Sequence, residues 1–184
     1  MKNVTVVLGS PRRNGNSAIM ANKAMEGIKA SGGDCEVFYL NGMKIRPCQA
    51  CGYCQRDKDN LCALYDDMGE IYRSIKNADA ILIASPVYMF TFTAQIKLFM
   101  DRCYACSEDL AGKKIGILLT YGNTDEVTSG AANAINTFKD EYRYTNSEIV
   151  GIVCARANEK GEVLQNGPVI ERAFQLGKDL AEWH

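Results

Sequence analysis

This chain of 184 residues is poor in histidine, in net charge and in long apolar runs. Its one histidine, His184, is the last residue, which argues against a Ser/His/Asp triad and against histidine acid/base or metal chemistry. Twenty-one Lys and Arg residues against 22 Asp and Glu residues give a net charge of −1. That balance provides no field to attract nucleic acid or an anionic membrane, so we expect neither as a partner.

No run of residues is long and apolar enough to cross a bilayer. The most apolar stretch, residues 78–100, is interrupted by Asp79, a proline, a glutamine and Lys97. The N-terminal apolar run, residues 4–8, is too short for the core of a signal peptide. We therefore expect a cytoplasmic protein. The length, with 47% hydrophobic and 23% charged residues, is typical of one globular domain over residues 1–184.

Short β-rich runs alternate with helical patterns along the chain. Four of the five strand candidates are nearly continuous apolar runs, as expected where helices cover both faces of a parallel sheet, and the second is typical of an edge strand. The pattern predicts strands at residues 4–8, 35–40, 80–84, 115–120 and 149–155, and amphipathic helices around residues 20–28, 68–75, 96–103, 131–142 and 169–180. We predict an α/β fold, a flavodoxin-like doubly wound five-stranded parallel sheet in the order 2-1-3-4-5 with helices on both faces. A ligand is then expected at the carboxyl ends of the strands, in the loops after strands one, three and four.

The loop after the first strand has the composition of an anion-binding site. Residues 9–17 combine glycines with serine, asparagine and arginine and lead directly into a helix, whose N-terminus offers unpaired N–H groups. A triphosphate-binding loop needs a lysine where this chain has Asn16, and the dinucleotide glycine pattern is absent. A single phosphate, as in a mononucleotide flavin, fits best. The alternative is a polar turn in which Asn16 or Ser17 caps the helix.

Two further loops carry features of a ring-binding site. Residues 85–91, after the third strand, include Pro86 and three bulky side chains, which suit the polar edge and the apolar face of a flavin. The alternative is that Tyr88 and Phe90 pack against the next helix. After the fourth strand, Gly122 lets the backbone approach a ligand, and an ordinary turn is the alternative there.

Four of the eight cysteines have an informative spacing, Cys48-x2-Cys51-x2-Cys54-x7-Cys62. Three thiolates within seven residues, with a fourth after a loop, suit a four-iron four-sulfur cluster. Zinc and free or redox-active thiols are the alternatives, because structural zinc sites more often use two separated Cys-x2-Cys pairs. The other cysteines, at positions 35, 103, 106 and 154, are typical of packing, with a redox pair of Cys103 and Cys106 as the less favoured alternative.

Several of these motifs together resemble those of the NAD(P)H-dependent FMN reductase group of flavodoxin-like proteins. The resemblance covers residues 1 to about 155 and rests on Gly9 to Ser17, Ser85-Pro86-Val87-Tyr88, Asp101-Arg102 and Thr120-Tyr121-Gly122. Within that group, the cysteine-rich insertion at about residues 46–64 is similar to that of the iron–sulfur flavoproteins, which implies Cys48, Cys51, Cys54 and Cys62 as cluster ligands. The resemblance implies bound FMN, with Ser10, Arg12, Asn16 and Ser17 at its phosphate, and with Pro86, Val87, Tyr88, Phe90, Tyr121 and Gly122 beside its ring and ribityl chain. It also implies a homodimer or homotetramer, with Asp101 and Arg102 structural or at a subunit interface rather than catalytic.

We therefore expect an FMN-dependent oxidoreductase that takes hydride from NAD(P)H, with the cofactor carrying the chemistry. The electrons would pass to a small acceptor such as a quinone or flavin, or singly through a cluster to a ferredoxin-type protein. The alternative is a flavodoxin-like electron carrier without its own NAD(P)H turnover. Such carriers are usually strongly acidic, so the net charge of −1 favours the enzyme. A flavin-free thiol sensor or zinc module conflicts with the loop after the first strand.

Overall fold

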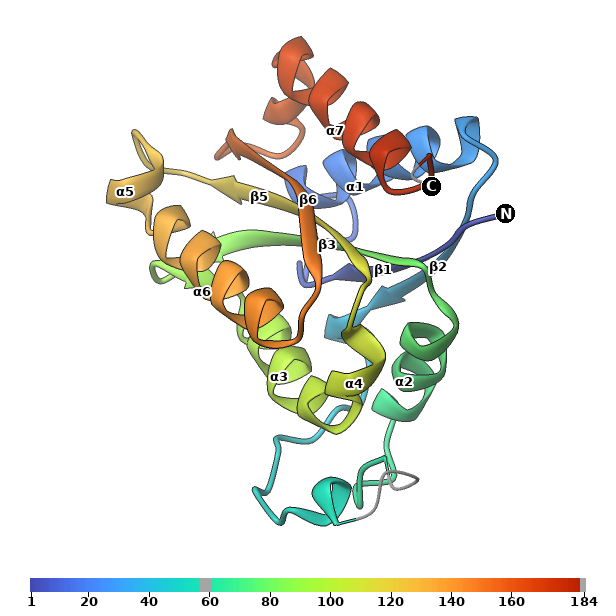
Figure 1. Ribbon diagram of the computed structural model, residues 1–184. Helices are drawn as coiled ribbons and strands as arrows, with labels where there is room; N and C mark the ends of the chain where they lie inside the picture. The colour runs from blue at the N-terminus through green and yellow to red at the C-terminus, as the bar shows by residue number, and fades with distance from the viewer. Residues whose placement is uncertain (57–60, 183–184) are drawn as a thin grey trace.

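A computed structural model describes residues 1–56 and 61–182 of the protein (Figure 1). Its main sheet contains five parallel strands: β1 (Asn3–Leu8), β2 (Asp34–Tyr39), β3 (Ala80–Tyr88), β5 (Lys114–Tyr121) and β6 (Glu148–Arg156). They lie in the order β2-β1-β3-β5-β6. All carboxyl ends of these strands therefore meet at one edge of the sheet, as in other doubly wound folds.

Helices cover both faces of the sheet (Figure 1). One layer contains α1 (Asn16–Ala30) and α7 (Gly167–Asp179); the other contains α2 (Met68–Asn77), α3 (Ala94–Cys103), α4 (Ser107–Leu110) and α6 (Ala131–Tyr144). Along β1, Val4 and Val6 belong to the core under the first layer, whereas Val7 belongs to the core under the second. Successive strand side chains point to opposite faces, so a strand buried on both faces becomes continuously apolar.

Short helical turns complete the structure. They are the 3-10 turns η1 (Leu40–Gly42), η2 (Tyr53–Gln55), η3 (Tyr104–Cys106) and η4 (Glu162–Gln165), and the four-residue helix α5 (Glu126–Ser129). In the part of the chain that the structure describes, every helix is too short or too polar to cross a membrane. His184, which the sequence singled out, lies outside the described residues.

The prediction of a purely parallel, five-stranded sheet was wrong in one respect. β3 continues four residues beyond the predicted end, to Tyr88, and pairs antiparallel with an additional strand, β4 (Thr91–Phe92). The path therefore reads 2-1-3-5-6 rather than 2-1-3-4-5, because β4 occurs between β3 and β5 in the chain. The reversal is made by Met89 and Phe90, both at positive φ (46° and 70°), which brings Val87 opposite Phe92. Neither residue type signals such a turn, since hairpins of this kind usually contain Asn and Gly.

Candidate functional site

The loop after β1 is held in a tight turn at the carboxyl edge of the sheet. Gly9 donates its N–H to the Ala84 carbonyl of β3 at 2.9 Å, and its own carbonyl accepts from the Thr93 hydroxyl at 2.9 Å. The Ser10 hydroxyl oxygen accepts from the Arg12 amide at 3.1 Å, and the Gly15 amide donates to the Arg12 carbonyl at 3.0 Å. These bonds place the start of α1 beside the end of β3.

The N-terminus of α1 has no capping side chain. Its N-cap residue is Gly15, so the alternative in which Asn16 or Ser17 caps the helix was wrong. The N–H groups of the first turn of a helix have no acceptor within the helix, and together with the helix dipole they attract an anion. Ser17 is 2% exposed in this turn, while Arg12 is exposed beside it. Backbone donors, two serines and Arg12 therefore all belong to the short segment that leads into α1.

Asn16 connects α1 to the loop after β6. Its Nδ2 donates to the Glu159 carbonyl at 2.8 Å, and its Oδ1 accepts from the Gly161 amide at 2.9 Å and from the Val163 amide at 3.4 Å. Both polar ends of this side chain therefore have protein partners. In this arrangement Asn16 positions the helix start. Its partners lie more than 140 residues further along the chain, so no local pattern predicts them.

The β3–β4 hairpin presents apolar side chains at the same edge. Met89 is 88% exposed and Phe90 59% exposed, and Tyr88 before them is also exposed. The backbone of Phe90 lies against the start of α6, where a Cβ on Gly130 (φ +83°) would come within 2.3 Å of the Phe90 Cα. The side-chain Nδ2 of Asn133 donates to the Phe90 carbonyl at 3.3 Å. Because its aromatic side chains remain outside the core, the hairpin is available for a ligand.

Replacing Met89 and Phe90 together by Asn and Gly should stabilise the flavin-free protein. Two non-glycine residues in the left-handed region each cost of order 1–3 kcal/mol, and Asn-Gly is the preferred pair for this turn. We expect a gain of about 1 kcal/mol or more, or roughly 2–4 °C in melting temperature per kcal/mol. Calorimetry would measure it. The double alanine variant, which removes the same exposed side chains but keeps the strain, should show no gain, and equal melting of the two variants would contradict the strain argument.

The loop after β5 packs against the loop after β6. The Tyr121 carbonyl accepts from the Ala157 amide at 2.8 Å, and the Gly122 carbonyl accepts from the Asn158 amide side chain at 2.9 Å. A Cβ on Gly122 would lie 2.1 Å from the Asn158 Oδ1, so a larger residue here would displace the Asn158 side chain. Sequence reasoning missed Asn158, although its place directly after a predicted parallel strand was a usable signal.

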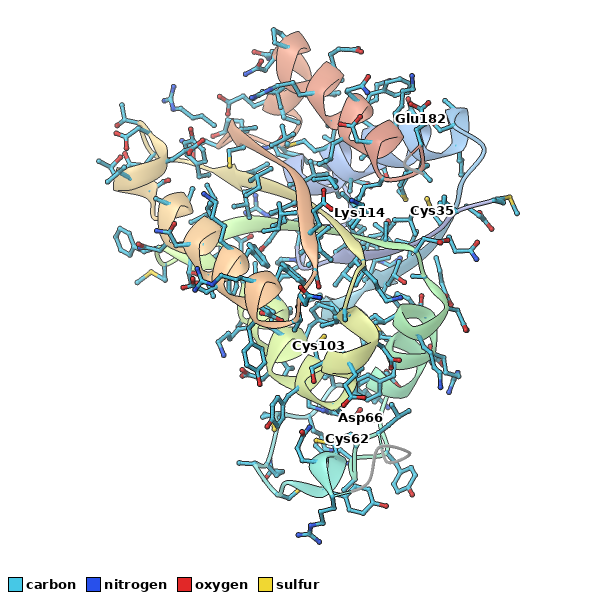
Figure 2. The ribbon with its side chains drawn as sticks, in the orientation of Figure 1. Cys35, Cys62, Asp66, Cys103, Lys114 and Glu182 are labelled. Atoms are coloured by element: carbon cyan, nitrogen blue, oxygen red, sulfur yellow. The ribbon has the colours of Figure 1, made fainter. Side chains whose placement is uncertain are left out.

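The cysteine-rich segment lies away from this edge, below the second helical layer (Figures 1 and 2). Cys48 and Cys51 are exposed, whereas Cys54 and Cys62 are partly buried. All four line one cavity of about 780 Å³, whose walls include Met100 of α3, Tyr104 directly after α3, and the last turn of α6. The sequence-predicted ligands therefore share one cavity.

The donor set of this cavity fits a metal cluster in chemistry. Thiolates are the ligands that iron–sulfur clusters use, and four of them face a common volume. Within residues 1–56 and 61–182, no group of three or more Cys, His, Asp or Glu side chains is gathered closely enough to hold a metal ion. Cluster assembly would therefore require the loop to draw its thiols together. Cys103 also lines the cavity, but it is buried, and burial raises the pKa of its thiol well above the ordinary value, as expected of a packing residue.

Glu141 of α6 lines the same cavity and is only partly exposed. Burial raises its pKa from 4.5 to about 7, with Lys97 opposing the rise and Asp101 adding to it. Between those pH values the folded protein binds more protons than the unfolded chain, so stability falls as pH rises from 4.5 to 7, and the full penalty remains above pH 7.

Glu141→Gln should therefore stabilise the protein by about 2 kcal/mol at pH 8 and by little at pH 5. The neutral amide keeps the shape of the side chain and removes the buried charge. Chemical denaturation at the two pH values would measure the difference. Asp140→Asn is the matched control, because Asp140 is exposed and pairs with Arg143 on the helix surface. A pH-independent effect of Glu141→Gln would contradict the burial of its charge.

The fold and the loops at its carboxyl edge define a doubly wound α/β protein whose first helix starts at this edge without a capping side chain. Residues 2–154 match the model of the NADPH-dependent FMN reductase family. The chain is 37% identical to an iron–sulfur flavoprotein of Archaeoglobus fulgidus over 96% of this chain and 77% of that protein. It is 33% identical to an iron–sulfur flavoprotein of Methanosarcina thermophila over 80% of this chain and 76% of that one.

A solved structure shares the fold. The NAD(P)H:quinone oxidoreductase from Methanothermobacter marburgensis superimposes with a TM-score of 0.76 at 20% identity, over 100% of this chain and 98% of that one. The present chain belongs to the NADPH-dependent FMN reductase family. It is an FMN-dependent oxidoreductase, with FMN and NAD(P)H as its cofactor and co-substrate. The resemblance stated from the sequence is confirmed, and the enzyme is favoured over the electron carrier.

Proposed function

We propose that this chain is an iron–sulfur flavoprotein, in which an FMN site at the carboxyl edge of the sheet works with a four-iron four-sulfur cluster held by Cys48, Cys51, Cys54 and Cys62. The observation that carries the proposal is that these four thiols line one cavity. Free thiols for packing would be expected in the core, yet two of the four are exposed. The relatives described as iron–sulfur flavoproteins support the same reading.

The FMN site is built from the three loops predicted to contain it. The Ser10 and Ser17 hydroxyls, the Arg12 guanidinium and the N–H groups at the start of α1 would hold the phosphate. Asn16 would support them by fixing the helix start rather than by contacting the phosphate, since both ends of its amide are engaged. Pro86, Val87, Tyr88 and Phe90 would line the ring on one side, with Tyr121 and Gly122 on the other.

FMN, when bound, supplies the hydride and electron chemistry. The protein's part is to orient a nicotinamide against the exposed ring face and to exclude water with the apolar hairpin. Backbone N–H groups of the loops after β3 and β5 would stabilise negative charge at the polar edge of the ring. The exposed Tyr88 and Phe90 are available to pack against the cofactor. No side-chain acid is needed for hydride transfer to a flavin.

The cluster would connect this two-electron site to one-electron partners. We propose a ferredoxin-type protein as acceptor where the cluster is present, and a small quinone or flavin otherwise. We further propose that residues 1–184 act as one FMN-binding domain with an insertion at about residues 46–64, in the cytoplasm, as a homodimer or homotetramer. All eight cysteines are free thiols in the structure, as is usual for proteins of a reducing compartment.

The decisive experiment is the visible spectrum of protein purified without oxygen, with iron, sulfide, zinc and extractable flavin assayed on the same sample. The proposal requires a flavin spectrum over a broad iron–sulfur shoulder and about four irons per chain. Flavin alone in a sample never exposed to air would leave a plain FMN reductase, and zinc in place of iron would replace the cluster by a structural metal.

A further inference from the structure

Both ends of the cysteine-rich segment meet one buried arginine of α3. Arg102 is 1% exposed, and its two terminal nitrogens donate to the two carboxylate oxygens of Asp66 at 2.7 and 3.1 Å. The first of them also donates to the Arg46 carbonyl at 2.8 Å. Residues 46 and 66 flank all four candidate ligand cysteines, so a single guanidinium joins the start of the segment, its end and the helical layer.

The carboxylate of Asp66 also accepts several hydrogen bonds from the protein. It accepts from the Arg46 amide at 3.0 Å and from the Met68 amide at 3.2 Å, in addition to the two bonds from Arg102. Burial opposes its ionisation, but the hydrogen bonds from Arg102 and from these amides lower the pKa of Asp66 below its ordinary value. The group is therefore a carboxylate at neutral pH, and Arg102 and Asp66 form a bidentate ion pair.

One donor of this pair remains unused. Among the residues that the structure describes, the Nε of Arg102 is the one buried side-chain nitrogen or oxygen without a hydrogen-bond partner. An unmade buried hydrogen bond costs about 1–3 kcal/mol, more for a charged group. Burial alone would lower the pKa of Arg102, but the bond to Asp66 raises it, and Tyr72 adds to the rise. The incompletely satisfied cation thus binds Asp66, which follows Cys62 by four residues in the chain; Figure 2 labels both residues at the base of the second helical layer.

Neighbouring contacts hold the arginine rigidly. The Tyr72 hydroxyl of α2 donates to the Arg102 carbonyl at 2.9 Å, and the guanidinium lies 6.0 Å from the centre of the Tyr72 ring. A buried ion pair by itself is weak evidence for stability, because removing two charges from water offsets much of their attraction. A pair that joins both ends of the cysteine segment and keeps an unused donor points to another role.

We propose that Arg102 and Asp66 position the cysteine segment for its cluster: the pair closes the segment against α3, and the fixed guanidinium, bound to Asp66 four residues after Cys62, stabilises the negative charge of the reduced cluster. The stabilisation of the reduced cluster rests on the proposed function, whereas the closure of the segment against α3 does not depend on a cluster. Arg102 acts through Arg46 and Asp66 at the two ends of the segment, and is a positioning residue rather than a ligand. Removing such a partner of a metal ligand typically costs about 10- to 100-fold in metal affinity.

The closure is tested on iron-free protein by hydrogen exchange. In Arg102→Gln and in Asp66→Asn, the amides of residues 44–46 and 61–68 should exchange faster than in the unmodified protein. Lys97→Gln is the matched control, because it removes from the same helix a cation that pairs with the exposed Asp101. It should leave the exchange rates of these amides unchanged. Unchanged exchange in both pair variants would overturn the closure, whether or not a cluster exists. Far-UV circular dichroism and flavin content identify any variant that has lost its fold, and Asp66→Asn, which keeps the side-chain shape, then serves as the test.

The charge effect is tested by the cluster's reduction potential, measured by a spectroscopic redox titration at pH 8. Arg102→Gln leaves an unbalanced carboxylate and should shift the potential to more negative values. Asp66→Asn leaves an unbalanced guanidinium and should shift it to more positive values. Shifts of the same sign in the two variants, or no shift, would overturn the electrostatic role. A pair with only a structural role gives no reason for the two reduction potentials to move in opposite directions. Absence of a cluster from the unmodified protein would instead overturn the proposed function and this second role, with the exchange result still deciding the closure.

Discussion

Cys51→Ser should abolish bound iron and leave the flavin in place. A serine hydroxyl is a much poorer ligand for iron–sulfur iron than a thiolate, and the loss of one of four ligands opens the cluster to solvent. Cys51 is exposed, so its replacement costs the fold little. We expect iron and sulfide to fall to background while extractable FMN per chain stays unchanged. Anaerobic purification followed by metal, sulfide and flavin assays would measure both.

Cys35→Ser is the matched control for this prediction. Cys35 lies in β2, outside the cysteine cavity, and burial raises the pKa of its thiol to about 11. The control variant should retain full iron and flavin. If Cys51→Ser kept its iron, the ligand assignment would be wrong, and if it lost flavin together with iron, the two sites would not be separable as the structure indicates.

The second large effect is expected at the phosphate site. Replacing Arg12 and Ser17 together by alanine should weaken FMN binding by about 100-fold, because each hydrogen bond to a charged phosphate contributes about 1.5–3 kcal/mol. Arg12 is exposed, so solvent screening keeps the contribution of each of these hydrogen bonds at the low end of that range. Titration of the flavin-free protein with FMN, followed by fluorescence quenching, would give the two dissociation constants.

Arg13→Ala separates a specific phosphate contact from general loss of positive charge. The Arg13 guanidinium lies over the Tyr39 ring at 4.8 Å, so this neighbour of Arg12 is occupied elsewhere. The control should bind FMN within a fewfold of the unmodified protein. Equal weakening by Arg13→Ala and Arg12→Ala would show that only the local charge matters, and unchanged affinity in the Arg12 and Ser17 double variant would place the phosphate elsewhere.

Local patterns predicted most of the architecture. The apolar runs located β1, β3, β5 and β6. Their continuity correctly indicated burial on both faces for β1, β3 and β5, whereas β6 lies at the edge of the sheet and is only partly buried. The β3–β4 hairpin escaped prediction because Met and Phe are not turn formers. They adopt positive φ here because β3 and β4 pair around them and the start of α6 packs against the Phe90 backbone.

The site was predicted by residue type better than by role. The loop after β1 lies where it was expected, yet Asn16 turned out to hold the loop after β6. Similarly, the sequence paired Arg102 with Asp101 as a motif but gave no indication that Arg102 binds Asp66 and Arg46. Hydrogen-bond partners so far apart in the chain depend on how the elements pack, and no spacing rule encodes them.

The sequence by itself determined the α/β class, the composition of the loop after β1 and the cysteine spacing, because each follows from local residue types and periodicity. Only the tertiary structure decided that four cysteines share one cavity, that both ends of their segment meet Arg102, and that the loops after β5 and β6 interlock. These features arise where segments distant in sequence are brought together by burial of the two apolar faces of the sheet. The balance of charge and desolvation at those contacts exists only in the folded chain.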